Sequence, residues 1–437
     1  MTAQIAIMNR EAVALASDSA VTLSQESDGL EDKQKIFTSA NKLFTLSKYQ
    51  PIGIMVYGSA EFMGIPLETI VKVYRNQLGD TSFNTLKEYG NDFIKFLDNG
   101  NKMFPESVQE TYIEATMSSF FEYIKSLISE EVQKIIITNG RIGRRAIRRI
   151  ITNTIKEQYF QWIEITNIPS IPNSFNKELE DKYEQVVNNT INNVFENMPL
   201  SSIDLRRLKK ISPWLFSRYP EHIRRSLNTG IVVAGFGTQE MFPSLVAYDM
   251  ELIVMDKLKY REYHSSEVNF NILGSIIPFA QGEMVHTFME GIAPDCKELE
   301  ASALDQAFKE YTNAVCDILD KYTPQEKEQL KARINEIGEN ALQSLTENLA
   351  EYRQENYVDP ITTVVAALPK DELAAMAESF VHLTSLQKRY TMEAETVGGA
   401  IDVAVISKGD GFIWIKRKHY FQSELNPGFI QRYYEED

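Results

Sequence analysis

The second residue of the chain, Thr2, is of a type that can supply both a nucleophile and a base. Once Met1 is removed, its hydroxyl can attack a carbonyl carbon while its own α-amine accepts the hydroxyl proton. An α-amine titrates near pH ~7.7–8.0, well below a lysine side chain at ~10.4, and burial beside a cation lowers its pKa further. This couple needs no histidine, and the five histidines of the chain form no evident motif.

Further short motifs follow Thr2 along the chain, each with a small or charged residue at an expected strand boundary. In order they are Asp18 in LASDSAVT, Lys42 in NKLFTL, Gly58 in YGSAE, Gly274-Ser275 in NILGSII and Gly398-Gly399 in VGGAIDVAVI. Each motif is weak alone, but the ordered set resembles the proteasome β-subunits and the bacterial HslV peptidase, which are N-terminal-nucleophile hydrolases. The resemblance covers about half of the chain, because the helical blocks are longer than those of the family.

The resemblance implies a role for each of these residues. Thr2 is the nucleophile, Lys42 the cation beside it, and Asp18 the carboxylate that holds Lys42 and balances its charge. The backbone N–H of Gly58 stabilises the oxyanion, a contact that contributes about 2.7–4 kcal/mol per donor in other enzymes. Ser275 supports the amine and a bound water. The implied substrate is a peptide or protein, the implied assembly is a homo-oligomer, and no metal or cofactor is implied.

By the same resemblance, a substrate pocket beside the nucleophile includes Val21, Val56 and Ala60. These side chains are apolar, so the pocket suits a hydrophobic residue before the scissile bond. Ordinary core positions for Val21 and Val56 explain the sequence equally well.

Each motif residue also has a purely structural explanation. Threonine is common after an initiator methionine, Asp18 could accept hydrogen bonds in a turn, and Gly58 could only end a strand. Lys42 could be a solvated charge at a sheet edge. Lys35 competes with Lys42 for the cation role, but Lys35 does not open the strand that precedes Gly58.

The chain departs from the family pattern near two of the motifs. Ala20 stands where the family usually has an arginine, Val397 where it has a serine, and Ala394 where it has an aspartate. Glu395 or Thr396 is the candidate replacement for the missing polar groups. These departures favour a second hypothesis, a catalytically inactive scaffold or binding subunit of the same fold. A third hypothesis is an amidase for small acyl-amides.

Hydrophobic periodicity predicts the order strands, helices, strands, helices, strands. Antiparallel hairpins that feed helical layers indicate an α+β sandwich, and the resemblance implies a four-layer αββα sandwich with large helical insertions. The sheet core is expected from residues 2–60, 226–281 and 395–437. Residues 61–225 and 282–394 are expected to form two helical layers, the first with a long basic insertion.

Two local patterns give sharper structural expectations. An Asp-Gly turn after Ile401–Ile406 predicts a closing hairpin. A helix is predicted over Pro324–Glu351, with its proline in the tolerated first turn. The residues expected on its buried side are Leu330, Ile334, Ile337, Leu342, Leu345 and Leu349.

Composition narrows the class of protein. The 437 residues are 43% hydrophobic with a net charge of −16, which suits a soluble globular chain and argues against general nucleic-acid binding. The two cysteines, Cys296 and Cys316, form no zinc or disulfide pattern. No signal-peptide run and no stretch near the ~18 apolar residues of a membrane span occurs. A cytoplasmic protein with no membrane partner is therefore expected.

The stretch RIGRRAIRRI holds Arg141, Arg144, Arg145, Arg148 and Arg149 within a region whose charge opposes that of the whole chain. Residues 140–230 carry 15 basic and 9 acidic residues, a net charge of +6. The favoured interpretation is an intramolecular match to the acidic remainder or a solvated helix face. The alternatives are an acidic partner, an unfoldase or another subunit, whereas no aromatic platform supports nucleic-acid binding. The chain has no GxxxxGK[ST] motif, so no intrinsic ATPase is expected.

Overall fold

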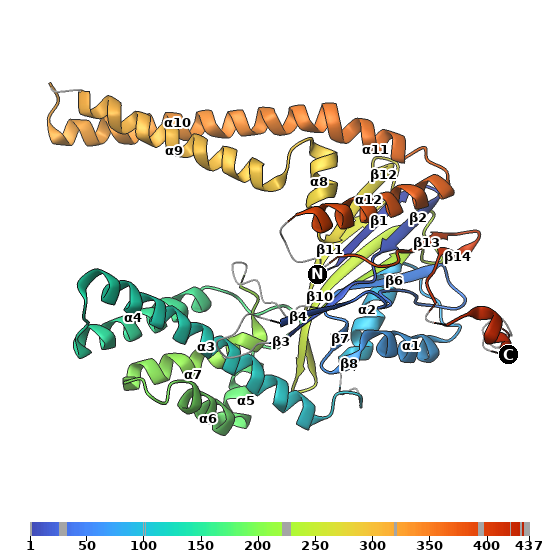
Figure 1. Ribbon diagram of the computed structural model, residues 1–437, viewed down its shortest axis with the longest axis horizontal. Coiled ribbons are helices and arrows are strands. Elements are labelled where there is room, and N and C mark those ends of the chain that lie inside the picture. Colours follow the sequence, from blue (N-terminus) through green and yellow to red (C-terminus); the bar gives the residue numbers. More distant parts are fainter. Residues whose placement is uncertain are drawn as a thin grey trace. The chain divides into compact units, whose positions relative to one another are not determined.

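The protein is a mixed α+β chain with several antiparallel sheets (Figure 1). The structure, a computed structural model, describes residues 2–25, 33–98, 100, 102–220, 229–318, 321–391, 397–419, 421–428 and 431. Among these described residues, no helix has the length and apolar character needed to cross a bilayer.

The chain divides into two compact units. Unit 1 contains Met1–Tyr57, Ala234–Leu245 and Ser266–Asp437, and unit 2 contains Gly58–Val233 and Val246–Ser265. The second expected helical block, residues 282–394, lies in unit 1 with the N-terminal strands.

The main sheet of unit 1 has five antiparallel strands in the order β12-β1-β2-β13-β14. Its strands are β1 (Ala3–Asn9), β2 (Ala12–Ser17), β12 (Gly274–Ala280), β13 (Asp402–Ser407) and β14 (Gly411–Lys416). The predicted hairpin β13–β14 is confirmed, and β1 and β2 form a second hairpin. The side-chain oxygen of Asn9 accepts hydrogen bonds from the backbone N–H groups of Glu11 and Ala12, which closes the first turn tightly.

Helices cover one face of this sheet. Helix α12 (Lys370–Tyr390) packs on β1, β2 and β13 and contacts α8 (Glu283–Glu290), and α11 (Asp359–Val365) packs on β12 and β1. The residues of β2 that face α12 are all alanines. Helix α12 can therefore lie close to the sheet, where it buries Leu373 and Phe380. A predominantly apolar layer therefore fixes the sheet from this side.

A hairpin of β5 (Leu43–Thr45) and β6 (Ile52–Gly58) covers the opposite face. A Cβ atom on Gly53 would lie 2.7 Å from the Ile406 side chain and 3.2 Å from the Leu15 side chain. A side chain at position 53 would require these neighbours to move, so Gly53 lets β6 lie close to β2 and β13. Unit 1 therefore has three layers: helices, the main sheet and this hairpin.

Strands β9 (Thr229–Gly235), β10 (Ser244–Val254) and β11 (Lys257–Glu267) belong to a second five-stranded sheet, with the order β11-β10-β9-β6-β5. The division between the units passes through this sheet, within β6, β9, β10 and β11. In unit 2, α1 (Leu67–Leu78) and α2 (Leu86–Leu97) follow the first strands. The Tyr248 hydroxyl of β10 donates to Asn91 Oδ1 of α2 at 3.1 Å, so α2 packs against this strand.

The expected helical layer after residue 61 forms a helical bundle in unit 2. Its helices are α3 (Glu106–Asn139), α4 (Arg144–Ile163), α5 (Phe175–Lys182), α6 (Glu184–Val194) and α7 (Ser202–Ser217). Phe120 of α3 meets the fully buried Trp162 of α4 edge to face, at 5.6 Å between ring centroids. The smaller elements of the chain are β3 (Val21–Gln25), β4 (Lys33–Phe37), β7 (Glu61–Phe62), β8 (Ile65–Pro66), η1 (Gln354–Val358) and η2 (Ser423–Leu425).

Helices α9 (Pro294–Ile318) and α10 (Pro324–Arg353) of unit 1 run side by side as a long hairpin (Figure 1), which we call the arm. The predicted buried side of α10 is wrong, because none of the residues of this helix is buried. Leu330, Ile334 and Leu342 are half-buried, whereas Ile337, Leu345 and Leu349 are exposed. The predicted helix itself is confirmed, but a two-helix hairpin covers only one strip of each helix.

Candidate active site

The side chains of Thr2, Asp18 and Lys42 form one buried cluster. The Lys42 ammonium donates to Thr2 Oγ1 at 2.9 Å, to Asp18 Oδ1 at 2.8 Å and to the Ala20 carbonyl oxygen at 2.5 Å. All three donors of the ammonium are therefore used. The exposed fractions are 2% for Thr2, 1% for Asp18 and 4% for Lys42. The structure thus brings together the three residues that the ordered motifs singled out.

The first hairpin places two members of this cluster. Gln4 lies opposite Ser17 in the β1–β2 register, and the Asp18 N–H donates to the Ala3 carbonyl at 3.1 Å. Thr2 and Asp18 are therefore at the open end of one tight hairpin. Lys42 directly precedes β5, and its side chain extends from there to Thr2 and Asp18. Its backbone carbonyl accepts a hydrogen bond from the Val56 N–H at 2.8 Å. Lys35, the competing lysine, lies in β4 with its ammonium over the Phe37 ring, outside this cluster.

Backbone amides hold the Asp18 carboxylate in one orientation. Oδ1 accepts from the Ala3 N–H at 3.2 Å, and Oδ2 accepts from Ala20 and Gly398, each at 3.2 Å. Gly398 is the first glycine of the VGGA motif, so this motif does reach the cluster. The second glycine, Gly399, has φ +82°, and a Cβ there would lie 2.7 Å from the Thr38 carbonyl oxygen. A residue with a side chain would therefore separate this loop from the site.

Burial lowers the pKa of Lys42 from its ordinary value, because removal from water disfavours the ammonium form. The ion pair and hydrogen bond with Asp18 act in the opposite sense, and the positive charge of Lys418 lowers the pKa further. Lys42 is therefore a cation that releases a proton more readily than an exposed lysine.

A row of buried polar side chains crosses the main sheet beside the cluster, and the sequence interpretation missed it. Gln4, Ser17 and Asp402 are neighbours on β1, β2 and β13, on the face that β6 covers. Gln4 Nε2 donates to Ser17 Oγ at 2.9 Å and to the Val56 carbonyl oxygen at 2.7 Å. Asp402 accepts from the Lys418 backbone N–H at 2.8 Å and pairs with the Lys418 ammonium. Polar residues inside the apolar strands AQIAIMN and DVAVIS were the available signal.

Ser275 does not lie beside Thr2. In the β1–β12 register Ala3 faces Ala280, whereas Ser275 faces Met8, five residues further along the strand and roughly 17 Å away. Gly274 and Ser275 begin β12 and do not end it, so the supporting role expected for Ser275 fails. The residue in that place is Gln281, whose N–H donates to the Thr2 carbonyl oxygen at 3.2 Å.

The other expected site residues are only partly characterised. Gly58 ends β6 with φ +81°, and its oxyanion role stays a prediction. Val56 is buried, and Val21 and Ala60 are half-buried, which leaves their pocket role a prediction too.

The described part of the segment before the VGGA glycines offers no polar side chain to the Thr2 cluster. Ala394, Glu395 and Thr396 lie outside the described residues. Val397 is fully buried in the apolar layer under α12, so it offers no polar group to the cluster.

Gln4 allows a test of how β6 is held on β1. Replacing Gln4 with methionine keeps the length of the side chain but leaves the Val56 carbonyl without this donor. We expect the free energy of unfolding to fall by about 1–3 kcal/mol, because a buried acceptor loses a partner. Urea denaturation measures the change. Gln77→Met, at an exposed position of α1, is the matched control and should stay within about 0.5 kcal/mol of the wild type. Equal effects of the two substitutions would show that Gln4 does not clamp β6.

The cluster has the parts needed to activate a hydroxyl group. A cation contacts the hydroxyl oxygen, and a carboxylate held by backbone amides fixes the cation. No protein-family model matches the chain, and no curated protein does either, so the chemistry must be inferred from this geometry.

Proposed function

We propose that the protein is a threonine-dependent hydrolase that cleaves peptide bonds through an acyl-enzyme at Thr2. The observation that carries this proposal is the position of the Lys42 ammonium, 2.9 Å from Thr2 Oγ1 and 2.8 Å from Asp18 Oδ1. A buried lysine donating to a threonine hydroxyl at the processed end of a chain is explained poorly by stability alone, because burying a charge is costly.

The four-layer αββα sandwich is part of the same proposal. In unit 1, α12 and the β5–β6 hairpin cover the two faces of the main sheet. In unit 2, α2 packs against β10 of the second sheet. These packings within each unit support the proposed sandwich.

The reaction begins with removal of Met1, which turns the Thr2 nitrogen into a free amine. This amine takes the proton of Oγ1 as the oxygen attacks the scissile carbonyl. The tetrahedral oxyanion accepts a hydrogen bond from the Gly58 N–H in this proposal. The amine then passes its proton to the leaving nitrogen, which frees the first product and leaves an ester on Oγ1. Water deprotonated by the same amine hydrolyses the ester and restores Thr2.

Lys42 assists through its charge. A nearby cation keeps the resting amine unprotonated, so that it can act as a base, and it stabilises the negative charge that develops on Oγ1. Lys418, paired with Asp402, supplies a second positive charge in the neighbourhood of Lys42. In our proposal it replaces the arginine that the chain lacks at Ala20.

A catalytically inactive scaffold is the second candidate. It is favoured by the position of Ser275 and by the apolar burial of Val397, since both remove polar partners from the amine. A scaffold has no need of a free Thr2 amine. The mass of the mature chain and its reactivity therefore separate the two candidates.

Electrophile labelling tests the proposal directly. Purified protein is treated with a peptide epoxyketone or a β-lactone, and the adduct is located by intact mass and peptide mapping. We expect a chain that lacks Met1 and carries one adduct on Thr2, because only a free N-terminal threonine presents a hydroxyl and an amine together. Thr2→Ala should lose the adduct, and Thr45→Ala, which removes a nearby strand hydroxyl, should keep it.

A confirmed free Thr2 without an adduct would contradict the enzyme proposal, and retention of Met1 would favour the scaffold. If labelling occurs, digestion of a peptide library beside a panel of small acyl-amides separates a peptidase from an amidase.

A further inference from the structure

Five arginines gather where α3 ends and α4 begins. Arg141, Arg144, Arg145, Arg148 and Arg149, which we call the basic tip, are all exposed. Residues 141–156 hold six basic side chains and no acidic one. None of the ion pairs between described residues includes an arginine of the basic tip. The exposure of these arginines agrees with the solvated helix face of the favoured interpretation, and the intramolecular acidic match stays a prediction.

The charges of the basic tip destabilise the first turns of α4. Helix α4 begins after Gly143 without a side-chain cap, and its first turn has no acidic residue. Cations at a helix N-terminus face the positive end of the helix dipole. Arg144 and Arg148, and likewise Arg145 and Arg149, are like charges four residues apart and repel each other. An anionic partner would turn this unfavourable arrangement into a favourable one.

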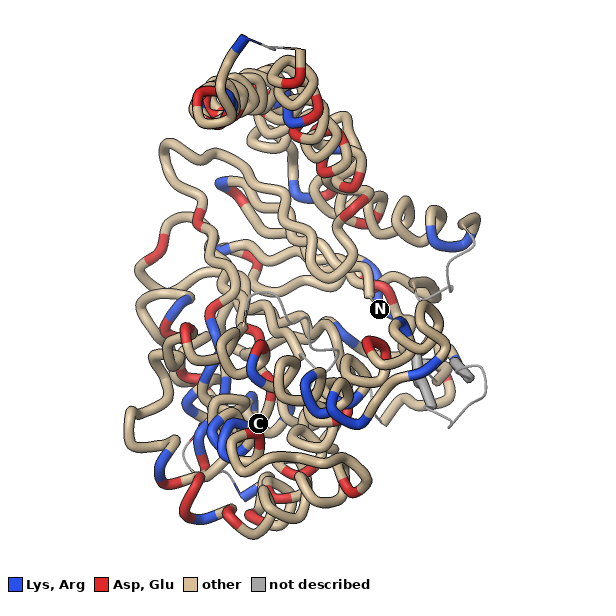
Figure 2. The backbone as a smooth tube through the Cα atoms, turned by 90° about the vertical axis from the view of Figure 1, so that its left-hand side faces the viewer, with Lys and Arg blue, Asp and Glu red and all other residues tan. Residues whose placement is uncertain are grey.

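The arm of the same chain has the opposite character. Helix α9 carries six acidic and two basic residues, and α10 carries six acidic and four basic, which gives the arm a net charge of −6. Figure 2 shows acidic residues spread along the two long helices at its top, with fewer basic residues between them. The arm is therefore a long anionic surface.

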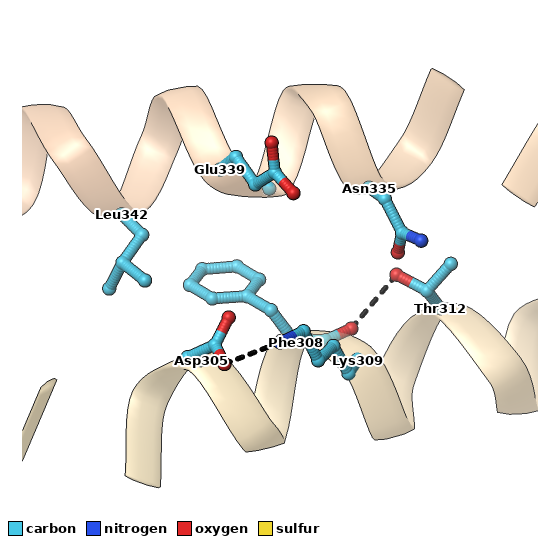
Figure 3. A pocket seen from close by; sticks show the side chains of 8 residues that line it. Asp305, Phe308, Lys309, Thr312, Asn335, Glu339 and Leu342 are labelled. Atoms are coloured by element: carbon cyan, nitrogen blue, oxygen red, sulfur yellow. Dashed lines mark hydrogen bonds and ion pairs between the residues drawn. The ribbon is translucent and has the colours of Figure 1, made fainter. Parts of the chain in front are cut away.

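The two helices of the arm pack against each other along a narrow strip of side chains. Figure 3 shows the Phe308 ring pointing from α9 toward α10, where Leu342 lies beside it. A Cβ on Gly338 would be 3.7 Å from this ring, and a cavity of about 40 Å³ remains between the helices. The interactions drawn there, Lys309 with Asp305 and Thr312 with the Phe308 carbonyl, both stay within α9 (Figure 3).

Apolar side chains flank this strip and face water. Tyr311 is 67% exposed, Ile318 77% and Ile337 61%. Such a surface on a helix pair is typical of an interface. Arm-to-arm pairing would bring two surfaces of charge −6 together, so a cationic partner fits better. At the end of α3, next to the basic tip, Ile137 is 84% exposed and offers apolar contact as well.

We propose that the basic tip of one copy of the chain docks on the arm of a second copy. The contact joins two different surfaces, so it either occurs twice in a reciprocal two-fold dimer or extends head to tail into a ring or a filament. The arginines pair with arm carboxylates while Ile137 meets the exposed apolar side chains. This inference is independent of catalysis at Thr2 and holds or fails without it.

Charge reversal tests the proposal. Sedimentation velocity over a range of protein concentrations is run at about 50 and 300 mM salt, which differ in how strongly they screen exposed charges. We expect concentration-dependent assembly that weakens at the higher salt. Arg145→Glu/Arg149→Glu should weaken self-association at least about tenfold, because two attractive contacts become repulsive. The matched control Lys177→Glu/Lys209→Glu makes the same charge change on exposed positions of α5 and α7 and should assemble normally.

Two further measurements keep the test decisive. The melting temperature of Arg145→Glu/Arg149→Glu should not fall, because the substitution removes repulsion within α4. Glu336→Lys/Glu347→Lys in the arm should also block assembly, and a chain with all four substitutions should regain it. A monomer at every concentration, or assembly indifferent to these reversals, would overturn the proposal. Salt-dependent binding of a labelled oligonucleotide to the tip without self-association would also overturn it.

Discussion

Replacing Thr2 with alanine is expected to lower kcat/KM for peptide hydrolysis by about 10⁴-fold or more, because the attacking oxygen is lost while the rest of the site stays. Alanine is also small enough to permit the removal of Met1 that the proposed mechanism requires. Thr2→Ser is the matched control, since it keeps the hydroxyl and the amine on one residue. We expect it to retain most of the activity. Peptide hydrolysis followed by mass spectrometry measures both variants.

The same assay carries a pH test. The acid limb of kcat/KM against pH reports the amine of the free enzyme. Lys42 lies beside that amine in the proposed mechanism and disfavours its protonated form. The apparent pKa of the acid limb should therefore lie below the ordinary α-amine range of ~7.7–8.0. Full activity in Thr2→Ala would place the nucleophile elsewhere in the chain. An inactive Thr2→Ala together with an unchanged pH profile of kcat/KM in Thr2→Ser would support a hydroxyl nucleophile and an amine base on the same residue.

Removing the Lys42 ammonium is expected to cost about 3–5 kcal/mol of unfolding free energy, because Asp18 would remain as a buried charge without its cation. Lys42→Met is the direct variant, and urea denaturation at pH 7 measures the loss. In Asp18→Asn/Lys42→Met the stranded charge is gone, so the double variant should lose less than the sum of the two single variants. Lys72→Met, which breaks an exposed pair with Glu68, should cost less than about 1 kcal/mol. Additive single effects would show that the two groups are not coupled.

The lowered pKa of Lys42 also predicts a dependence of stability on pH. Between this lowered value and 10.5, the ordinary value, the unfolded chain keeps the Lys42 proton and the folded chain releases it. The unfolded state then binds more protons, so the contribution of Lys42 to the free energy of unfolding rises with pH through this window. Below the lowered pKa both states are protonated and the contribution is flat. Because tyrosines such as Tyr248 also titrate at high pH, the difference between wild type and Lys42→Met isolates this slope.

The buried cluster of Thr2, Asp18 and Lys42 could be predicted from the sequence because its geometry is local. Alternating strands joined by a tight turn at Asn9 return the chain to its start, which puts Asp18 next to Thr2 whatever lies further along. Lys42 opens a strand whose neighbour ends at Gly58, so the ordered motifs reflected pairings between nearby segments. Helical periodicity in the long blocks was equally local, and the helices formed where the spacing predicted them.

Tertiary structure decided what each element packs against. Ser275 and Gln281 lie on or beside β12, and only its register with β1, set by segments more than 250 residues apart, chooses between them. The row from Gln4 to Asp402 likewise needs β13 beside β2. The spacing in α10 predicted a buried side, but burial requires a neighbour that periodicity does not name. Sequence therefore determined the local conformations and the identity of the residues in the cluster, whereas register and burial depended on surfaces that meet only when the chain has folded.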